Sequence, residues 1–176
     1  MNKLHPLQMG LYTVGLTLLL SGINVSPKLI VCSIFMVLSL AMGLWMQTVY
    51  GRKNAFTVIL SSIGLYGVGM SLMQESLYLY SFIPFGVACY VASAAFEKFK
   101  QNRMMPLAIF MALVSGVVVD GLLIAPWELM HFGAEKLPLI MVKGLSYKTF
   151  YAGLLSLFVW GVYDFKTGHS RFFRKF

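Results

Sequence analysis

The stretch QTVYGRKNA at residues 47–55 decides how this chain folds, because it separates two long apolar runs with a glycine and two adjacent cations. Gly51 permits a sharp reversal of the chain. Arg52 and Lys53 follow directly, and cations that flank apolar runs mark the cytoplasmic face of a membrane protein. The stretch therefore predicts a tight cytoplasmic turn between two membrane-spanning helices.

The composition makes the same prediction for the whole chain. Of its 176 residues, 59% are hydrophobic and only 11% are charged, whereas a soluble domain carries about 25% charged residues. A chain of this length cannot hide so much apolar surface in one aqueous core. The net charge of +8 comes from short basic groups between apolar segments, not from one basic face, so we expect a lipid bilayer and no nucleic acid as partner.

Segments of about 20 mainly apolar residues are long enough to cross a bilayer as helices. The chain divides into six such segments, with breakers that include Pro126 and Pro138 between them. We therefore predict an all-α integral membrane protein with one transmembrane domain over residues 1–176. The expected spans are about 7–24, 29–49, 55–74, 77–97, 105–125 and 138–163. The first segment resembles a signal peptide, but the charge alternation along the chain requires it as a helix.

The distribution of Lys and Arg between the loops predicts the orientation. With six spans, ten of these cations fall on one side, two on the other, and Lys143 and Lys148 inside the last span. By the positive-inside rule, both termini are then cytoplasmic. The ten are Lys3, Arg52, Lys53, Lys98, Lys100, Arg103, Lys166, Arg171, Arg174 and Lys175.

Ionisable residues inside the spans are the first candidates for a functional site, because a charge in the hydrocarbon is costly. Asp120, Lys143 and Lys148 are the three such residues of the predicted spans. Lys143 can extend toward the surface, whereas Lys148 lies near the midplane. One interpretation is that Asp120 pairs with Lys143 or Lys148 and locks the last two helices. The other is a polar cavity walled by Asp120, Lys148 and, one turn further along, Tyr151.

Other polar groups give weaker signals. Glu128 and His131 have a spacing found in metal sites, but we expect an ordinary solvated pair in an outer loop. Gln47 and Thr48 lie one turn inside the predicted cytoplasmic end, where they either line an inner gate or, for the threonine, bond back to the helix. We expect no catalytic residues, no metal site and no cofactor, and hence no enzyme, since motifs for such chemistry are lacking.

The stretch TVYGRKNAFTVIL resembles a signature of the VUT (vitamin uptake transporter) family, also called queuosine precursor transporters. Further likenesses are SGVVVDGLLI around Asp120 and SYKTFYAGLL around Lys148. The acidic residue that the family carries between its Thr and Tyr is Val49 in this chain. The resemblance implies six helices similar to the substrate-binding (S) components of energy-coupling-factor transporters. The residues of this chain that match the family's pattern are Thr48, Tyr50, Gly51, Asp120 and Lys148.

The function implied by this resemblance is import of a small planar solute, a 7-deazaguanine-type queuosine precursor, across a bacterial inner membrane. Asp120, Lys148, Tyr151, Tyr50, Thr48 and Gln47 are then the expected substrate-binding residues. Two alternatives stay open: an S-component-like subunit of an ATP-driven importer, and a non-catalytic accessory subunit of a larger membrane assembly. Partners beyond the solute and the bilayer would then be a membrane complex or further copies of the chain.

Overall fold

The computed structural model describes residues 5–25, 28–72, 82–102 and 105–167, and all regular secondary structure within them is α-helical. The helices are α1 (Pro6–Val25), α2 (Leu29–Tyr50), α3 (Arg52–Leu72), α4 (Phe82–Asn102), α5 (Met105–Phe132) and α6 (Leu137–Thr167). The expected all-α class is thus confirmed. Among the described residues, four helices, α1, α2, α3 and α5, are long and apolar enough to cross a bilayer, as in a multi-pass membrane protein.

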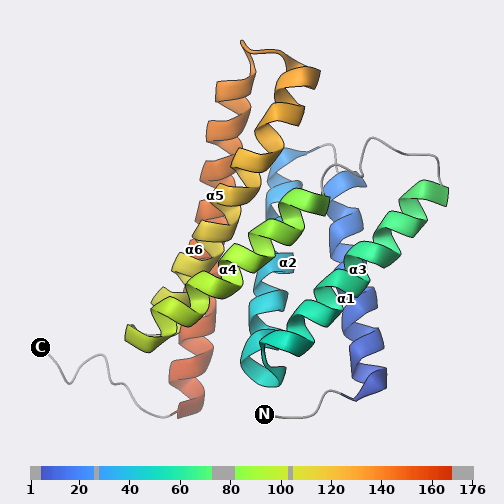
Figure 1. Cartoon of the computed structure of the whole chain (residues 1–176). Coiled ribbons are helices and arrows are strands. Elements are labelled where there is room, and N and C mark those ends of the chain that lie inside the picture. Colours follow the sequence, from blue (N-terminus) through green and yellow to red (C-terminus); the bar gives the residue numbers. More distant parts are fainter. Residues whose placement is uncertain (1–4, 26–27, 73–81, 103–104, 168–176) are drawn as a thin grey trace, which may run out of the picture.

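Helix α2 is the centre of the bundle. It contacts each of the other five helices, and Figure 1 shows it between the α5–α6 hairpin on one side and α1 and α3 on the other, with α4 crossing in front. Its sequence explains this position, because α2 is apolar on all sides and such a helix is stable when neighbours surround it. Leu40, near its middle, is 1% exposed.

Close approach of α4 to α5 depends on small residues. A Cβ atom on Gly116 would lie 3.1 Å from the carbonyl oxygen of Ala88 and 3.1 Å from the Cβ atom of Ala92. Small residues of this kind let helix backbones come together in lipid, where dispersion contacts replace the hydrophobic effect. The buried Ser33 and Ser39 hydroxyls donate to carbonyl oxygens of the preceding turn at 2.7 and 2.8 Å, so their polar atoms are satisfied inside the core.

The predicted turn at Gly51 is present and separates α2 from α3. Gly51 has φ 88° and ψ 162°, a backbone conformation that is nearly exclusive to glycine. Its N–H donates to the carbonyl oxygen of Gln47 at 3.1 Å, which closes the last turn of α2. Since α3 begins at Arg52, the reversal is sharper than the expected start at residue 55.

The prediction that Pro126 breaks the fifth helix is wrong, because α5 continues through it to Phe132. A proline inside a helix removes one N–H bond, here to the carbonyl of the residue four positions earlier, Leu122. Leu122 is 62% exposed at the edge of the helix, and membrane helices tolerate such an interruption. Pro138 lies in the first turn of α6, where no N–H bond is lost.

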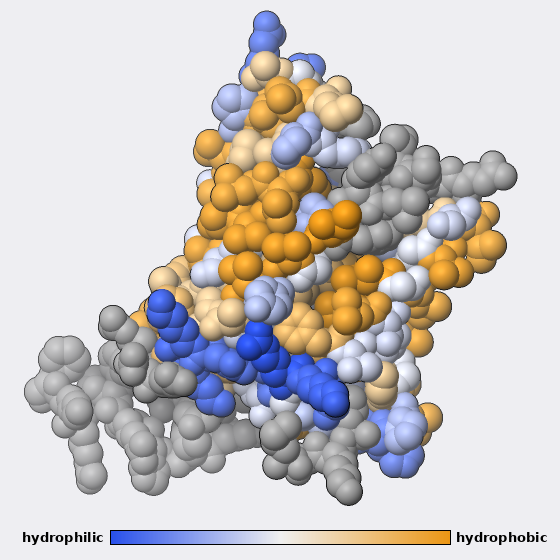
Figure 2. All heavy atoms as spheres, in the orientation of Figure 1, coloured by the Kyte–Doolittle hydropathy of each residue, from blue (hydrophilic) through white to orange (hydrophobic). Residues whose placement is uncertain are grey.

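The remaining boundaries agree with the predicted spans to within a few residues, except that α4 extends to Asn102 and α6 to Thr167. The predicted ends at 73–74 and 77–81 lie outside the described residues. Figure 2 shows hydrophobic atoms over most of the visible face, with a hydrophilic band across the ends where α2 meets α3 and where α4 terminates. The cytoplasmic location of this end, and the single domain over residues 1–176, stay predictions.

Candidate functional site

The α5–α6 hairpin brings Asp120 and Lys148 to the same level. The turn between the two helices runs from Gly133, with φ 78°, to Lys136. Asp120 lies thirteen residues before this turn and Lys148 twelve residues after it. Because the helices are antiparallel and rise 1.5 Å per residue, both residues lie about 20 Å from the turn, in the interior of the bundle.

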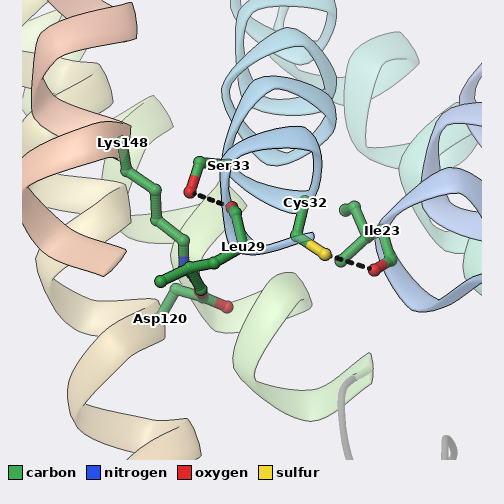
Figure 3. Close-up of polar contacts among 6 residues, drawn as sticks. All are labelled: Ile23, Leu29, Cys32, Ser33, Asp120 and Lys148. Atoms are coloured by element: carbon green, nitrogen blue, oxygen red, sulfur yellow. Dashed lines mark hydrogen bonds and ion pairs between the residues drawn. The ribbon is translucent and has the colours of Figure 1, made fainter. Parts of the chain in front are cut away.

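The two side chains form a buried ion pair. Lys148 Nζ donates to Asp120 Oδ2 at 2.8 Å, and the side chains are 16% and 8% exposed. Figure 3 shows the lysine reaching from α6 toward the carboxylate on α5, beside Leu29 at the start of α2. Of the two ion pairs that the sequence allowed, the structure contains this one, while the Lys143 side chain is exposed.

A cavity of about 350 Å³ adjoins the ion pair between α5, α6 and the first residue of α2. Lys148 and Glu128 are its charged lining residues. Gly121 and Gly144 widen it: a Cβ atom on Gly121 would meet nothing within 4 Å, and one on Gly144 would meet Leu29 at 3.8 Å. The other lining residues are Leu29, Val117, Val118, Leu122, Ile124, Pro138, Ile140, Met141, Val142 and Leu145. The volume is within the range of small-molecule sites.

Tyr151 lies on α6, one turn after Lys148, but it is not among the lining residues of this cavity. Its half-buried ring meets Phe150 edge-on, with the ring centroids 5.6 Å apart, and packs against the hydrophobic core. The structure therefore places Tyr151 near the ion pair along the helix without directing it into the cavity.

Gln47, Thr48 and Tyr50 are not brought together with Asp120 and Lys148. They lie at the opposite end of α2 from Leu29, and the 18 residues from Leu29 to Gln47 correspond to about 27 Å of helix. The exposed Thr48 donates to the carbonyl oxygen of Trp45 at 2.7 Å. This is the local bond to its own helix that the sequence offered as one of two interpretations.

A second polar cluster surrounds the buried Gln47. Its Nε2 donates to Glu97 Oε1 at 3.0 Å, and Glu97 Oε2 lies 3.6 Å from Arg52 Nη1. The Arg52 guanidinium also lies over the rings of Phe56 and Tyr90, at 5.7 and 5.3 Å from their centroids. The cluster links α2, α3 and α4 at one end of the bundle.

Tyr50 makes a separate contact at the same end of α2. Its hydroxyl lies 3.3 Å from that of Tyr12, and both rings pack with Trp45. These aromatic contacts join α2 to α1. At the other end of α2, the Cys32 thiol donates to the carbonyl oxygen of Ile23 at 3.0 Å and makes a similar link (Figure 3).

Two acidic residues, Glu97 and Glu128, differ from what the sequence predicted. Glu97 was not predicted as a partner of Gln47 and Arg52. The sequence did contain one indication of the contact with Arg52, because the two residues carry opposite charges and both lie at the predicted cytoplasmic face of the membrane. Glu128 was expected in a loop, and this is wrong because α5 includes it and directs it to the cavity.

The described residues contain no group of three or more His, Cys, Asp or Glu that could hold a metal ion.

Comparisons with protein-family models, with curated proteins and with solved structures give no match for this chain. The chain's own geometry therefore carries the functional argument. It consists of a buried ion pair, an adjoining apolar cavity and a second carboxylate on the cavity wall.

Proposed function

We propose that this protein is a membrane transporter for a small planar solute, which binds in the α5–α6 cavity beside Asp120 and Lys148. The observation that carries the proposal is that the Lys148 ammonium belongs both to a buried ion pair and to the lining of a cavity of about 350 Å³. Charged groups in a membrane interior are costly and characteristically mark solute pathways.

The chemistry of the cavity fits a flat ring with a few polar edge groups. Aliphatic side chains of α5 and α6 form most of the wall, and such walls pack against the faces of a ring, while a few polar groups fix its orientation. Lys148 can donate to a carbonyl oxygen, and Asp120 can accept from an N–H group. Because an ammonium has three N–H donors, Lys148 can bind a solute oxygen while it stays paired with Asp120.

The specific candidate is a 7-deazaguanine-type queuosine precursor, carried across a bacterial inner membrane. This identification rests on the sequence resemblance around Tyr50, Asp120 and Lys148, and the ring has both the carbonyl and the N–H groups that the cavity requires. The apolar walls favour a neutral ring over a phosphorylated nucleotide, since burying a phosphate without a matching cation is costly.

The test is uptake of radiolabelled 7-cyano-7-deazaguanine into proteoliposomes that contain the purified protein. The double variant Asp120→Asn/Lys148→Met removes both charges together and so leaves no orphan charge to unfold the bundle. We expect it to remain folded and to lose uptake at least about tenfold, the effect of removing buried hydrogen-bonding partners. Lys143→Met, which changes an exposed lysine of the same helix, is the control and retains uptake.

Two results would redirect the proposal. Wild-type uptake that also persists in the folded double variant places the pathway elsewhere in the molecule. No uptake by the wild type alone, restored when a partner ATPase complex is added, identifies a substrate-binding subunit instead of an autonomous transporter.

A further inference from the structure

Glu128 lies on the face of α5 that borders the cavity. The α5 residues that line the cavity include Val117, Gly121, Ile124 and Glu128, which are three or four positions apart and therefore form one stripe along the helix. This position follows from the continuation of α5 past Pro126. Without that continuation, Glu128 would leave the stripe.

The charge of Glu128 is not neutralised by a bonded partner. Asp120 and Lys148 offset each other at 2.8 Å, whereas Glu128 has no hydrogen bond or ion pair with any residue that the structure describes. It is half-buried and lies within electrostatic range of both members of the pair. The cavity wall therefore holds one carboxyl group whose hydrogen-bonding capacity is unused.

A carboxylate without a hydrogen-bonding partner on an apolar wall favours ligands that carry hydrogen-bond donors. Its two oxygens accept two parallel N–H groups, and such two-point contacts are stronger and more directional than single hydrogen bonds. Lys148, in contrast, can only donate. The ligand that complements both residues carries two adjacent N–H donors at one edge and an acceptor elsewhere on the ring.

We propose that Glu128 is the specificity-determining residue of this cavity and that it recognises the amidine edge of a planar ring, formed by a ring N–H and the neighbouring exocyclic amine. This inference rests on the proposed function and names the group by which the solute is selected. Lys148, the other charged residue of the cavity wall, can donate to an acceptor elsewhere on the same ring.

The experiment compares two rings that differ in one amine. Binding of 7-deazaguanine and of 7-deazahypoxanthine, which lacks the exocyclic amine, is measured by isothermal titration calorimetry on the whole protein in nanodiscs. Wild type is expected to bind the amine-bearing ring at least about tenfold more tightly, because the other ring leaves a carboxylate oxygen without its donor. In Glu128→Gln the ratio falls to about onefold, since an amide offers one acceptor and one donor. Glu135→Gln, at an exposed position in the α5–α6 turn, retains the wild-type ratio.

The possible failures are distinguishable. If wild type binds both rings with equal affinity, or if Glu128→Gln retains the preference, the role of Glu128 is refuted while the proposed function stands. If wild type binds neither ring and imports neither, the proposed function fails and the inference fails with it. A retained ratio in folded Glu128→Gln, checked by circular dichroism, refutes the inference without ambiguity about folding.

Discussion

Replacement of Lys148 by methionine tests whether the Asp120–Lys148 pair is as buried as its geometry indicates. At a separation of 2.8 Å and an effective dielectric constant of about 20, the Coulomb attraction is about 6 kcal/mol. Desolvation costs several kcal/mol for each ion and offsets most of this attraction. Lys148→Met removes the attraction and leaves Asp120, which is 5% exposed, without its counterion. The expected loss of unfolding free energy is about 3–5 kcal/mol.

The assay is unfolding in mixed micelles with increasing SDS, followed by far-UV circular dichroism. The double variant Asp120→Asn/Lys148→Met should regain stability to within about 1 kcal/mol of wild type, and the double-mutant cycle should give a coupling energy of at least about 2 kcal/mol. Lys143→Met, the same substitution at an exposed position of α6, should change stability by no more than about 0.5 kcal/mol. If Lys148→Met costs as little as Lys143→Met, or if the coupling energy is near zero, the reasoning is refuted.

Three glycine substitutions test the cavity, the helix contact and the turn. Gly121→Leu places a side chain in open space and should weaken binding of the ring, measured by calorimetry, at least about tenfold, because the side chain fills the cavity. Gly161→Leu also places a side chain in open space, but away from the cavity, and should leave binding unchanged. Gly116→Ala places a methyl group 3.1 Å from α4 atoms and should cost about 1–3 kcal/mol in SDS unfolding. Gly51→Ala, at φ 88°, should cost about 1–3 kcal/mol, whereas Gly64→Ala, with open space and no positive φ, should be neutral or stabilising. Equal effects in a variant and its control would contradict the assigned role.

The approximate positions of the helices that the structure describes were predictable because they depend on the length and polarity of segments, which are local properties; of the six predicted spans, four are long and apolar enough among the described residues. The end of α5 was not, because the effect of Pro126 depends on where its neighbours lie. A proline that leaves one carbonyl without its N–H partner is tolerated at the edge of the bundle and disfavoured in its core. The sequence gives no sign of which situation applies, since apolar residues occupy all sides of α5.

The pairing of Asp120 with Lys148 was among the predicted interactions because each residue has a definite depth along its span. Their lateral meeting, by contrast, requires the rotation of both helices about their axes. A soluble helix reveals its buried face through an amphipathic pattern, but helices that are apolar on every side do not. For the same reason, neither the contact of Gln47 with Glu97 nor the position of Glu128 on the cavity wall could be predicted. Both depend on helix rotation and on partners far away in the sequence.

The energetics of the ion pair favour a functional explanation for its presence. A buried pair replaced by apolar residues of similar volume is often neutral or stabilising, so stability alone does not require Asp120 and Lys148. A pair that only locked two helices would be best surrounded by close packing, because contact with a cavity forfeits dispersion energy. Here the ammonium borders a cavity that Gly121 and Gly144 widen. Open space against a buried ammonium is what a solute-binding site needs and what a helix lock does not need, and this favours a binding site over a purely structural lock.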